Sequence, residues 1–376
     1  MKITRVLKAT LLKYLVAGKV NIIFGARRVG KTFLLKEVIQ ELGIPTLFFN
    51  GDLPDNQEFL AERNIEKYRN IFEGKELIVI DEAQVIPAIG LVLKIIIDEM
   101  PNLKVVASGS SAFDLNNKLG EPLVGRAYWH EMFPLAQQEI KQYENILETK
   151  RNLEERLLYG SYPDVYLLSS FEEKERYLRE LVNSYLLKDI ISFDGIRNSA
   201  KVYDLLRLIA YQLGKEISLL ELGNQLGMSK NTVEKYLDLL EKVYVLKRVG
   251  AYSKNLRKEI SKSSRWYFWD NGVRNAIIGD FRPIKFRSDI GELWENYLIT
   301  ERIKKYKYER KYLDSYFWRT YDQQEIDYLE VKNQMIEAFE FKWGNKKAKI
   351  PKVFLEAYPE STFTIVSREN YLDFIS

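Results

Sequence analysis

A glycine-rich octapeptide near the N-terminus contains residue types that bind phosphate. It follows an apolar run at residues 20–24 and precedes a helical pattern at residues 33–42. Glycines let the backbone wrap a polyphosphate, so that its N–H groups and the N-terminus of the following helix face the anion. Lys31 would then reach the β and γ phosphates, and the hydroxyl of Thr32 would ligate the Mg²⁺ that bridges them. The pattern predicts nucleotide binding by Gly25, Ala26, Arg27, Arg28, Val29, Gly30, Lys31, Thr32 and Phe33.

Two acids follow a second apolar run at residues 76–80. A buried parallel strand would carry Asp81 and Glu82 out at its C-terminal edge, where ligands bind in open α/β sheets. Asp81 would hold Mg²⁺ through water, and Glu82 would act as general base toward the attacking water. A strand that ends in a helix cap has the same pattern, but the phosphate-binding loop upstream favours the catalytic interpretation.

Three further side chains are candidates for the same site. Ser108 and Ser110 follow a third apolar run, and either hydroxyl could sense the γ-phosphate by hydrogen bonding. Capping of the next helix is the alternative role for these serines. Arg126 could neutralise charge that develops on the transferred phosphoryl group. A surface ion pair explains Arg126 equally well.

Composition sets the outer limits. A chain of 376 residues is long enough for two or three domains. The net charge of +4 is small, so an argument for nucleic-acid binding must rest on local clusters. The absence of cysteine and the single histidine, His130, exclude disulfide frameworks, thiolate metal sites and multi-histidine zinc sites. The charged N-terminus and Lys13 argue against a signal peptide or membrane span, so we expect a cytoplasmic protein.

The order of these motifs resembles the AAA+ superfamily, in particular its prokaryotic branch in which an ATPase is fused to a C-terminal domain of uncertain function. The resemblance rests on the phosphate-binding loop and on residues 79–84, 108–113, 123–126 and 133–135, and it extends over nearly the whole chain. It implies ATP with Mg²⁺ rather than GTP, since no guanine-reading Asn-Lys-x-Asp motif is present. The Gly-x-x-Pro turn at residues 160–163 resembles one that such relatives place near the adenine, which adds Pro163 to the expected nucleotide-binding residues.

A two-helix motif follows in the middle of the chain. A capping box at residues 218–221 starts the first helix, a turn contains Gly227, and a second helix at residues 230–242 precedes a strand at residues 243–249. This order is typical of a winged helix-turn-helix. Its outer face would present Lys230, Asn231, Glu234 and Lys235. The basic residues of the wing region, which could follow a phosphate backbone, are Lys242, Lys247, Arg248, Lys254, Arg257, Lys258, Lys262 and Arg265. The same module in AAA+ relatives often packs as a lid or interaction surface.

The C-terminal part contains a second set of chemical residues. Residues 316–319, 325–329 and 336–343 have the pattern of strands, and positions two apart in a strand share a face. Two carboxylates and a lysine on one face can bind a divalent metal and activate a water. The pattern resembles the restriction-endonuclease-like PD-(D/E)XK fold, although Ile326 stands where that family usually has proline. The residues at its motif positions are Glu295, Asp327, Glu340 and Lys342. An ordinary ion pair on a half-exposed strand is the alternative.

Basic and aromatic residues alternate in the segment between these motif positions. Such interleaving could hold a nucleic-acid strand by charge and stacking, and a solvated helix end has a similar composition. The residues are Arg302, Lys304, Lys305, Tyr306, Lys307, Tyr308, Arg310, Lys311 and Tyr312.

These observations predict a multidomain α/β protein. We expect a P-loop ATPase domain with a parallel sheet at residues 1–160, a helical lid or connector at 161–200, a winged helix-turn-helix at 201–275 and a nuclease-like α/β domain at 285–376. The expected function is ATP hydrolysis with Mg²⁺, coupled to action on DNA. The alternative is a nucleotide-switched regulatory or scaffold protein that binds a protein partner and has an inactive nuclease-like domain. An oligomer is required if Arg126 acts on the ATP of a neighbouring subunit.

Overall fold

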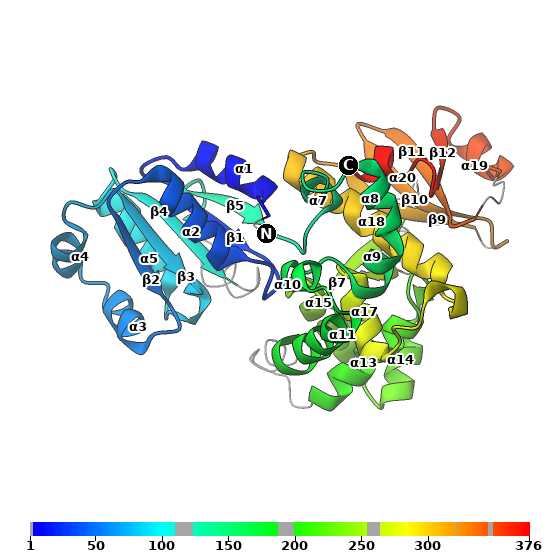
Figure 1. The fold of residues 1–376 in the computed structure, drawn as a ribbon, viewed down its shortest axis with the longest axis horizontal. Coiled ribbons are helices and arrows are strands. Elements are labelled where there is room, and N and C mark those ends of the chain that lie inside the picture. Colours follow the sequence, from blue (N-terminus) through cyan, green and yellow to red (C-terminus); the bar gives the residue numbers. More distant parts are fainter. Residues whose placement is uncertain (1–2, 110–122, 187–198, 254–263, 321, 345–348) are drawn as a thin grey trace. The chain divides into compact units, whose positions relative to one another are not determined.

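A computed structural model describes residues 3–109, 123–186, 199–253, 264–320, 322–344 and 349–376. The chain forms two compact units (Figure 1). The first comprises residues 1–134 together with Lys242–Tyr244, and the second comprises Leu135–Glu241 and Val245–Ser376.

The first unit is built on a five-stranded sheet in the order β2-β3-β4-β1-β5, in which every neighbouring pair is parallel. All five residues of β1 and of β3 are buried, as expected for continuous aliphatic runs in a covered parallel sheet. The strands are β1 Val20–Phe24, β2 Thr46–Asn50, β3 Leu77–Asp81, β4 Lys104–Gly109 and β5 Ala127–Glu131. The helical elements are α1 Val6–Tyr14, α2 Lys31–Leu42, α3 Pro54–Ala61, α4 Ile65–Phe72, η1 Ala83–Val85 and α5 Ile89–Glu99.

The register of this sheet determines where its functional residues lie. Parallel pairing aligns Phe24 at the end of β1 with Gly109 at the end of β4, and Asn50 with Asp81. The loop after β1 and the acids after β3 therefore lie along one edge of the sheet. His130 lies within β5 and its Nε2 is 2.8 Å from the side-chain oxygen of Asn21, which is a structural role.

The second unit contains a seven-stranded mixed sheet in the order β12-β11-β10-β9-β7-β8-β6. Its strands are β6 Glu216–Ile217, β7 Leu246–Ala251, β8 Ser264–Phe268, β9 Asp314–Arg319, β10 Glu325–Lys332, β11 Met335–Lys342 and β12 Thr362–Ser367. Its helices include α7 Gln137–Ile140, α8 Ile146–Arg151, α9 Leu153–Tyr159, α10 Pro163–Leu167, α11 Phe171–Glu180, the π-helix Leu181–Leu186 and α13 Ser199–Tyr211. They continue with α14 Leu219–Leu226, α15 Lys230–Lys242, α17 Asn271–Ile278, η4 Ile284–Phe286, α18 Ile290–Glu309, α19 Lys352–Ala357 and α20 Tyr371–Ile375.

One sheet joins the two regions that the sequence suggested as separate domains at residues 201–275 and 285–376. β7 pairs in parallel with β9, with Gly250 opposite Tyr316, and the Tyr252 N–H donates to Phe317 O at 2.8 Å. The pairing satisfies backbone groups that would otherwise form an open sheet edge. The hairpin of β7 and β8 is therefore continuous with the C-terminal strands (Figure 1).

The two-helix motif has the local structure that its sequence predicts. The Ser218 side chain accepts from the Glu221 N–H at the start of α14, and Gly227 ends this helix in the left-handed conformation. Val233, Leu237 and Leu240 of α15 are buried. The side chains on the outer face are exposed and comprise Lys230, Asn231, Glu234 and Lys235.

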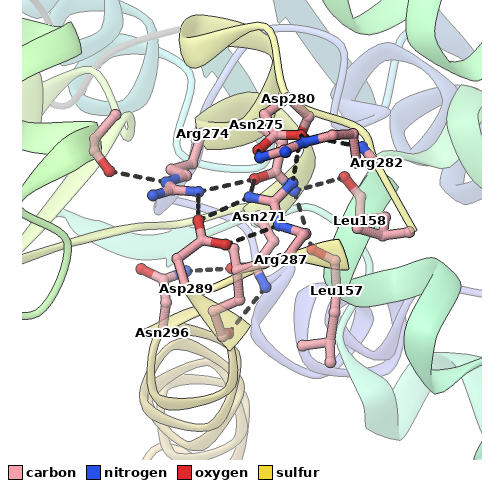
Figure 2. A network of polar contacts seen from close by, with 12 residues as sticks. Leu157, Leu158, Asn271, Arg274, Asn275, Asp280, Arg282, Arg287, Asp289 and Asn296 are labelled. Atoms are coloured by element: carbon pink, nitrogen blue, oxygen red, sulfur yellow. Dashed lines mark hydrogen bonds and ion pairs between the residues drawn. The ribbon is translucent and has the colours of Figure 1, made fainter. Parts of the chain in front are cut away.

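A buried polar network fastens α9 to α17 and α18, and Figure 2 shows its central members. The side-chain amide of Asn275 donates to Leu157 O at 3.1 Å and Leu158 O at 2.8 Å, at the end of α9. Arg274 and Arg287 both donate to Asp289, at 2.5 and 2.8 Å. Burial opposes ionisation of Asp289, but hydrogen bonds and the charges of these two arginines hold its pKa below the ordinary value. Paired charges and amides thus add to the apolar packing of Leu157, Val273 and Ile277, which are also buried.

Asp280, at the edge of this network, makes a pH-dependent contribution to stability. Its hydrogen bonds from Arg282, at 2.9 and 2.8 Å, lower its pKa from 3.8 to about 2. A depressed carboxyl pKa stabilises the fold above the unfolded value and loses this effect as the pH falls through the folded value. We expect Asp280→Asn to cost about 1 kcal/mol near neutral pH, since solvent screens the pair, and to cost progressively less as the pH falls from 3.8 through about 2. Urea unfolding over a pH series measures this difference, and equal acid sensitivity of both proteins would contradict it.

Candidate functional site

The loop between β1 and α2 depends on glycine at both ends. A Cβ atom at Gly25 would lie 1.9 Å from Met132 O, so no side chain fits there. Gly30 has φ +97° directly before the first residue of α2, a conformation that favours glycine. The chain therefore turns sharply enough to direct backbone N–H groups and the start of α2 toward one point, as a phosphate-binding loop requires.

Lys31 is folded over this loop. Its side chain is buried, and Nζ donates to Gly25 O at 2.9 Å and Ala26 O at 3.0 Å. An ammonium group so close to the loop backbone is within reach of phosphate oxygens bound by the same loop. Backbone carbonyls hold the ammonium in the position that the sequence predicts for phosphate binding.

Asp81, the last residue of β3, accepts hydrogen bonds from two hydroxyl groups. Thr32 Oγ1 donates to Asp81 Oδ2 at 2.6 Å, and Ser108 Oγ donates to Asp81 Oδ1. Asp81 is only 4% exposed. A carboxylate next to a hydroxyl is the oxygen donor set that Mg²⁺ prefers, so Thr32 and Asp81 fit the cation expected with ATP. Ser110, the alternative sensor, lies outside the described residues.

Glu82 leaves the strand in a constrained conformation. Its backbone has φ +48° and ψ +43°, and its carboxylate accepts from Gln84 Nε2 at 2.6 Å. A Cβ atom at Gly51 would lie 2.5 Å from Glu82 O, so the neighbouring loop packs directly against this turn. The tight turn positions the proposed general base, and the amide of Gln84 fixes its carboxylate.

Arg5 is a site residue that sequence reasoning missed. Its guanidinium donates to Val29 O at 2.5 Å and to Phe133 O at 2.7 Å, and it is 4% exposed. It therefore supports the phosphate-binding loop from the segment before α1. A single arginine near the N-terminus has no local pattern that distinguishes it from a surface arginine.

Arg126 does not belong to the nucleotide site of its own chain. It directly precedes Ala127, which pairs with Val20 at the start of β1, whereas the phosphate-binding loop follows the other end of β1. The length of the strand therefore separates Arg126 from the loop. Its Nε donates to Asp98 at 3.0 Å, and both side chains are well exposed. Arg126 thus makes the surface ion pair that was the alternative, and a role in a neighbouring subunit stays a prediction.

The Gly-x-x-Pro turn lies in the second unit, where Pro163 begins α10. Its glycine, Gly160, has φ +73°, and a Cβ atom there would lie 1.9 Å from the Asp270 carboxylate. Asp270 is buried and accepts from the Ser161 N–H at 2.7 Å and from the Val273 N–H at 3.1 Å. The described contacts give this turn a structural role as an anchor for α17, and adenine binding by Pro163 stays a prediction.

The four nuclease-like motif residues lie close together in the second unit. Glu295 is on α18, which packs against β8 and β11, Asp327 is on β10, and Glu340 and Lys342 are on β11. Lys342 Nζ donates to Glu340 at 2.6 Å, and the Phe341 N–H donates to Asp327 at 2.8 Å. Burial and the charge of Glu340 raise the pKa of Asp327, while burial and the charge of Asp327 raise that of Glu295. Strand spacing and the resemblance to the PD-(D/E)XK fold thus pointed to residues that lie in one acidic cluster.

Arg265 and Tyr267 on β8 complete this cluster. The sequence pattern had placed Arg265 in the basic wing region. The Arg265 guanidinium lies 3.7 Å from Glu295 and 2.7 Å from Glu325, and its side chain is 5% exposed. Tyr267 donates to Glu295 at 2.6 Å. Arg265 is therefore not part of an exposed basic wing, because its buried guanidinium pairs with carboxylates on other elements.

Three of the nine residues of the expected basic and aromatic surface are buried, namely Arg302, Lys304 and Tyr308. Arg302 donates to both oxygens of the buried Glu330, at 2.8 and 2.9 Å, and Tyr306 donates to the same carboxylate at 2.8 Å. Lys304 is 2% exposed and pairs with Glu301 at 2.7 Å. The predicted nucleic-acid surface is wrong for Arg302 and Lys304, because these cations neutralise acids inside the unit.

Two features are absent from the described residues. No helix among them is long and apolar enough to cross a membrane. No group of three or more histidine, cysteine, aspartate or glutamate side chains in the part of the chain that the structure describes is arranged to hold a metal ion.

Three family models match the chain. Residues 17–141 match a family described as an AAA domain. Residues 150–283 and 290–373 match two families that are each described as a domain of unknown function, DUF8612 and DUF4143. The first match spans β1 to β5 and the phosphate-binding loop, and it confirms the expected AAA-type P-loop domain. The winged-helix and nuclease-like assignments stay predictions.

Similar curated proteins are themselves named as uncharacterised. One from Haemophilus influenzae is 24% identical over 339 residues, which cover 83% of this chain and 80% of that protein. One from Mycobacterium tuberculosis is 26% identical over 333 residues, which cover 87% of this chain and 71% of that protein. Their names assign no activity.

Solved structures show weaker likeness. The RuvB Holliday junction branch migration motor of Thermotoga maritima is 18% identical, with a TM-score of 0.31 and coverage of 64% of this chain and 85% of that chain. AMPPCP-bound DnaA from Aquifex aeolicus is 17% identical, with a TM-score of 0.28 and coverage of 63% and 86%. TM-scores at this level do not establish a shared fold.

Proposed function

We propose that this protein is a Mg²⁺-dependent ATPase whose catalytic residues lie in the first unit. The observation that carries the proposal is the convergence of Lys31, Thr32, Asp81 and Ser108 at one edge of the parallel sheet. Their side chains come from the phosphate-binding loop and from two neighbouring strands. The match of residues 17–141 to an AAA domain supports the same function.

Each of these residues has a defined role in phosphoryl transfer to water. Lys31 would exchange the carbonyls of Gly25 and Ala26 for phosphate oxygens and stabilise the charge that builds up on them. Thr32 and Asp81 would hold Mg²⁺, which when bound neutralises charge between the phosphates. Ser108, already hydrogen-bonded to Asp81, would respond to occupancy of the site.

Glu82 would take the proton from the attacking water. Its carboxylate currently accepts from Gln84 at 2.6 Å, so one oxygen is engaged. A general base needs hydrogen-bond reach to the water, and geometry before ligand binding is often incomplete. We infer that Gln84 holds Glu82 until bound nucleotide rearranges this turn.

Replacement of the general base tests the proposal. We expect Glu82→Gln to bind ATP as the wild type does and to hydrolyse it on the order of 10²- to 10⁴-fold more slowly, because the amide cannot accept the proton. Binding is measured with a fluorescent ATP analogue and hydrolysis by phosphate release. Glu73→Gln, at an exposed acid of the same unit, is the matched control and keeps full activity. Hydrolysis by Glu82→Gln at the wild-type rate would exclude Glu82 as the base.

The second unit supports a DNA-directed use of this ATPase. The outer face of α15 presents Lys230, Asn231 and Lys235 to solvent, while Val233 and Leu237 anchor the helix from below. A helix of this kind after a short turn can enter the major groove, with lysines contacting phosphates. Engagement of DNA by α15 is therefore the favoured use, and a nucleotide-switched protein that binds a protein partner is the alternative.

Salt-dependent binding distinguishes these uses. We expect Lys230→Glu/Lys235→Glu to reduce duplex affinity at least about 10-fold and to lower the slope of log affinity against log salt by about 2, since two phosphate contacts are lost. Fluorescence anisotropy over a salt series measures both quantities. Lys349→Glu/Lys352→Glu changes the same charge on an exposed part of the second unit and leaves binding unaltered. Absence of DNA binding by the wild type would favour the protein-directed alternative.

A further inference from the structure

The acidic cluster of the second unit has a guanidinium beside it. Arg265 lies 3.7 Å from Glu295 and 2.7 Å from Glu325, and the charge of Asp327 also acts on it. An arginine keeps its charge at any pH that a folded protein tolerates. The cluster therefore contains a permanent cation supplied by the chain.

The sheet fixes Arg265 in this position. Its backbone lies in β8, paired with Val249 on β7 and with Glu216 on β6. Its guanidinium also lies over the ring of Phe317, 4.4 Å from the ring centre. A side chain that two strands, an aromatic face and two carboxylates hold in place is part of the folded core.

The remaining carboxylate contacts are protein donors. Tyr267 donates to Glu295 at 2.6 Å, the Phe341 N–H donates to Asp327 at 2.8 Å, and Lys342 donates to Glu340 at 2.6 Å. A divalent metal in this cluster would bind to the carboxylates of Glu295 and Asp327, which lie beside the fixed charge of Arg265. No three acidic, histidine or cysteine side chains in the described part of the chain are arranged to hold a metal ion. A divalent metal at this cluster would therefore be repelled by the positive charge of the guanidinium.

We propose that Arg265 replaces a divalent metal as the counter-ion of Glu295 and Asp327, so that this acidic cluster needs no metal. The guanidinium supplies one positive charge and hydrogen bonds, but it has no exchangeable ligand position at which a water is activated. The cluster then stabilises the junction of α18, β8, β10 and β11. This inference does not depend on ATP hydrolysis in the first unit.

Manganese binding to the full-length protein tests the inference. The parent for all measurements is Asp81→Asn without nucleotide, which removes the metal ligand of the first unit. We expect no Mn²⁺ binding by this parent in calorimetry and no change of its melting temperature with Mn²⁺. Arg265→Gln should melt roughly 10 °C lower, because buried carboxylates lose their cation, and Mn²⁺ should restore much of the loss. Added Asp327→Asn should abolish that restoration.

A matched variant tests whether restoration of the melting temperature by Mn²⁺ is specific to the loss of Arg265 or follows the loss of any arginine in the sheet. The described partners of the Arg319 side chain on β9 are Glu216, at 2.9 Å, and Gln323, rather than the cluster carboxylates, so Arg319→Gln should not respond to Mn²⁺. Mn²⁺ binding by the parent that Asp327→Asn removes would overturn the inference. A folded Arg265→Gln protein that ignores Mn²⁺ would overturn it as well. If Arg265→Gln does not fold, the parent and its Asp327→Asn variant still decide the question.

Discussion

Lys31→Ala is expected to lower ATP hydrolysis by on the order of 10³-fold and to weaken ATP binding severely. The buried Lys31 ammonium lies against the carbonyls of Gly25 and Ala26, at 2.9 and 3.0 Å, inside the phosphate-binding loop. Its removal leaves phosphate charge without a cation in a site that excludes much of the water, where electrostatic interactions are strongest. Titration with a fluorescent ATP analogue and a phosphate-release assay measure the two losses separately.

Lys36→Ala is the matched control for this prediction. Lys36 lies on the same helix, α2, and is exposed. Its removal changes the net charge of the protein equally but takes no cation from the loop, so activity should stay within about two-fold of the wild type. Comparable losses in both variants would show that overall charge, rather than the placed ammonium, controls activity. Retained activity in Lys31→Ala would refute the assignment of the nucleotide site.

Arg302→Met is expected to destabilise the second unit by about 3–5 kcal/mol. Arg302 donates two hydrogen bonds to Glu330, which is 4% exposed. Removal of the guanidinium leaves the Glu330 carboxylate buried, and the Tyr306 hydroxyl is the hydrogen-bond donor that remains among its described partners. A buried carboxylate without a counter-ion lowers the free energy of unfolding by more than the loss of its hydrogen bonds alone. Chemical denaturation, followed by tryptophan fluorescence, measures the change in the free energy of unfolding.

The double variant Arg302→Met/Glu330→Met distinguishes an unpaired charge from lost packing. Removal of both charges should recover most of the stability, because no buried carboxylate is left. Lys311→Met is the surface control, since Lys311 pairs with Glu309 in a largely exposed position. It should change stability by less than about 0.5 kcal/mol. A double variant as unstable as the sum of its single variants would mean that packing of the Arg302 stem, rather than its charge, is decisive.

Local patterns predicted those parts of the sites that are contiguous in the chain. The glycines and Lys31 of the phosphate-binding loop follow from the requirement that backbone wraps an anion, and the structure places Gly25 where no Cβ fits. The sequence predicted Ser218 as a helix cap, and its side chain accepts a hydrogen bond from the Glu221 N–H. Alternation on β11 placed Glu340 and Lys342 on one face, where they pair at 2.6 Å. For Lys31, Ser218 and the Glu340–Lys342 pair, the interacting residues lie within a few residues of one another.

Local patterns did not predict the structural roles of single arginines. Arg5, Arg265 and Arg302 have no local signal that separates them from solvated side chains, yet each is buried against partners distant in the chain. Sequence order made Arg126 a candidate catalytic residue. Parallel pairing of β5 with β1 places it near the start of β1, whereas the phosphate-binding loop follows the end of β1. No pattern of neighbouring residues encodes such distances.

The sequence by itself determined the AAA-type phosphate-binding loop, the acids at the end of β3 and the identity of the four motif residues of the second unit. Only the tertiary structure decided which lysine and arginine side chains belong to these sites and which neutralise buried carboxylates elsewhere. The physical reason is that backbone geometry and periodicity are local, whereas the state of a charged side chain depends on the carboxylates and solvent around it after folding. Those surroundings are assembled from strands and helices far apart in the chain.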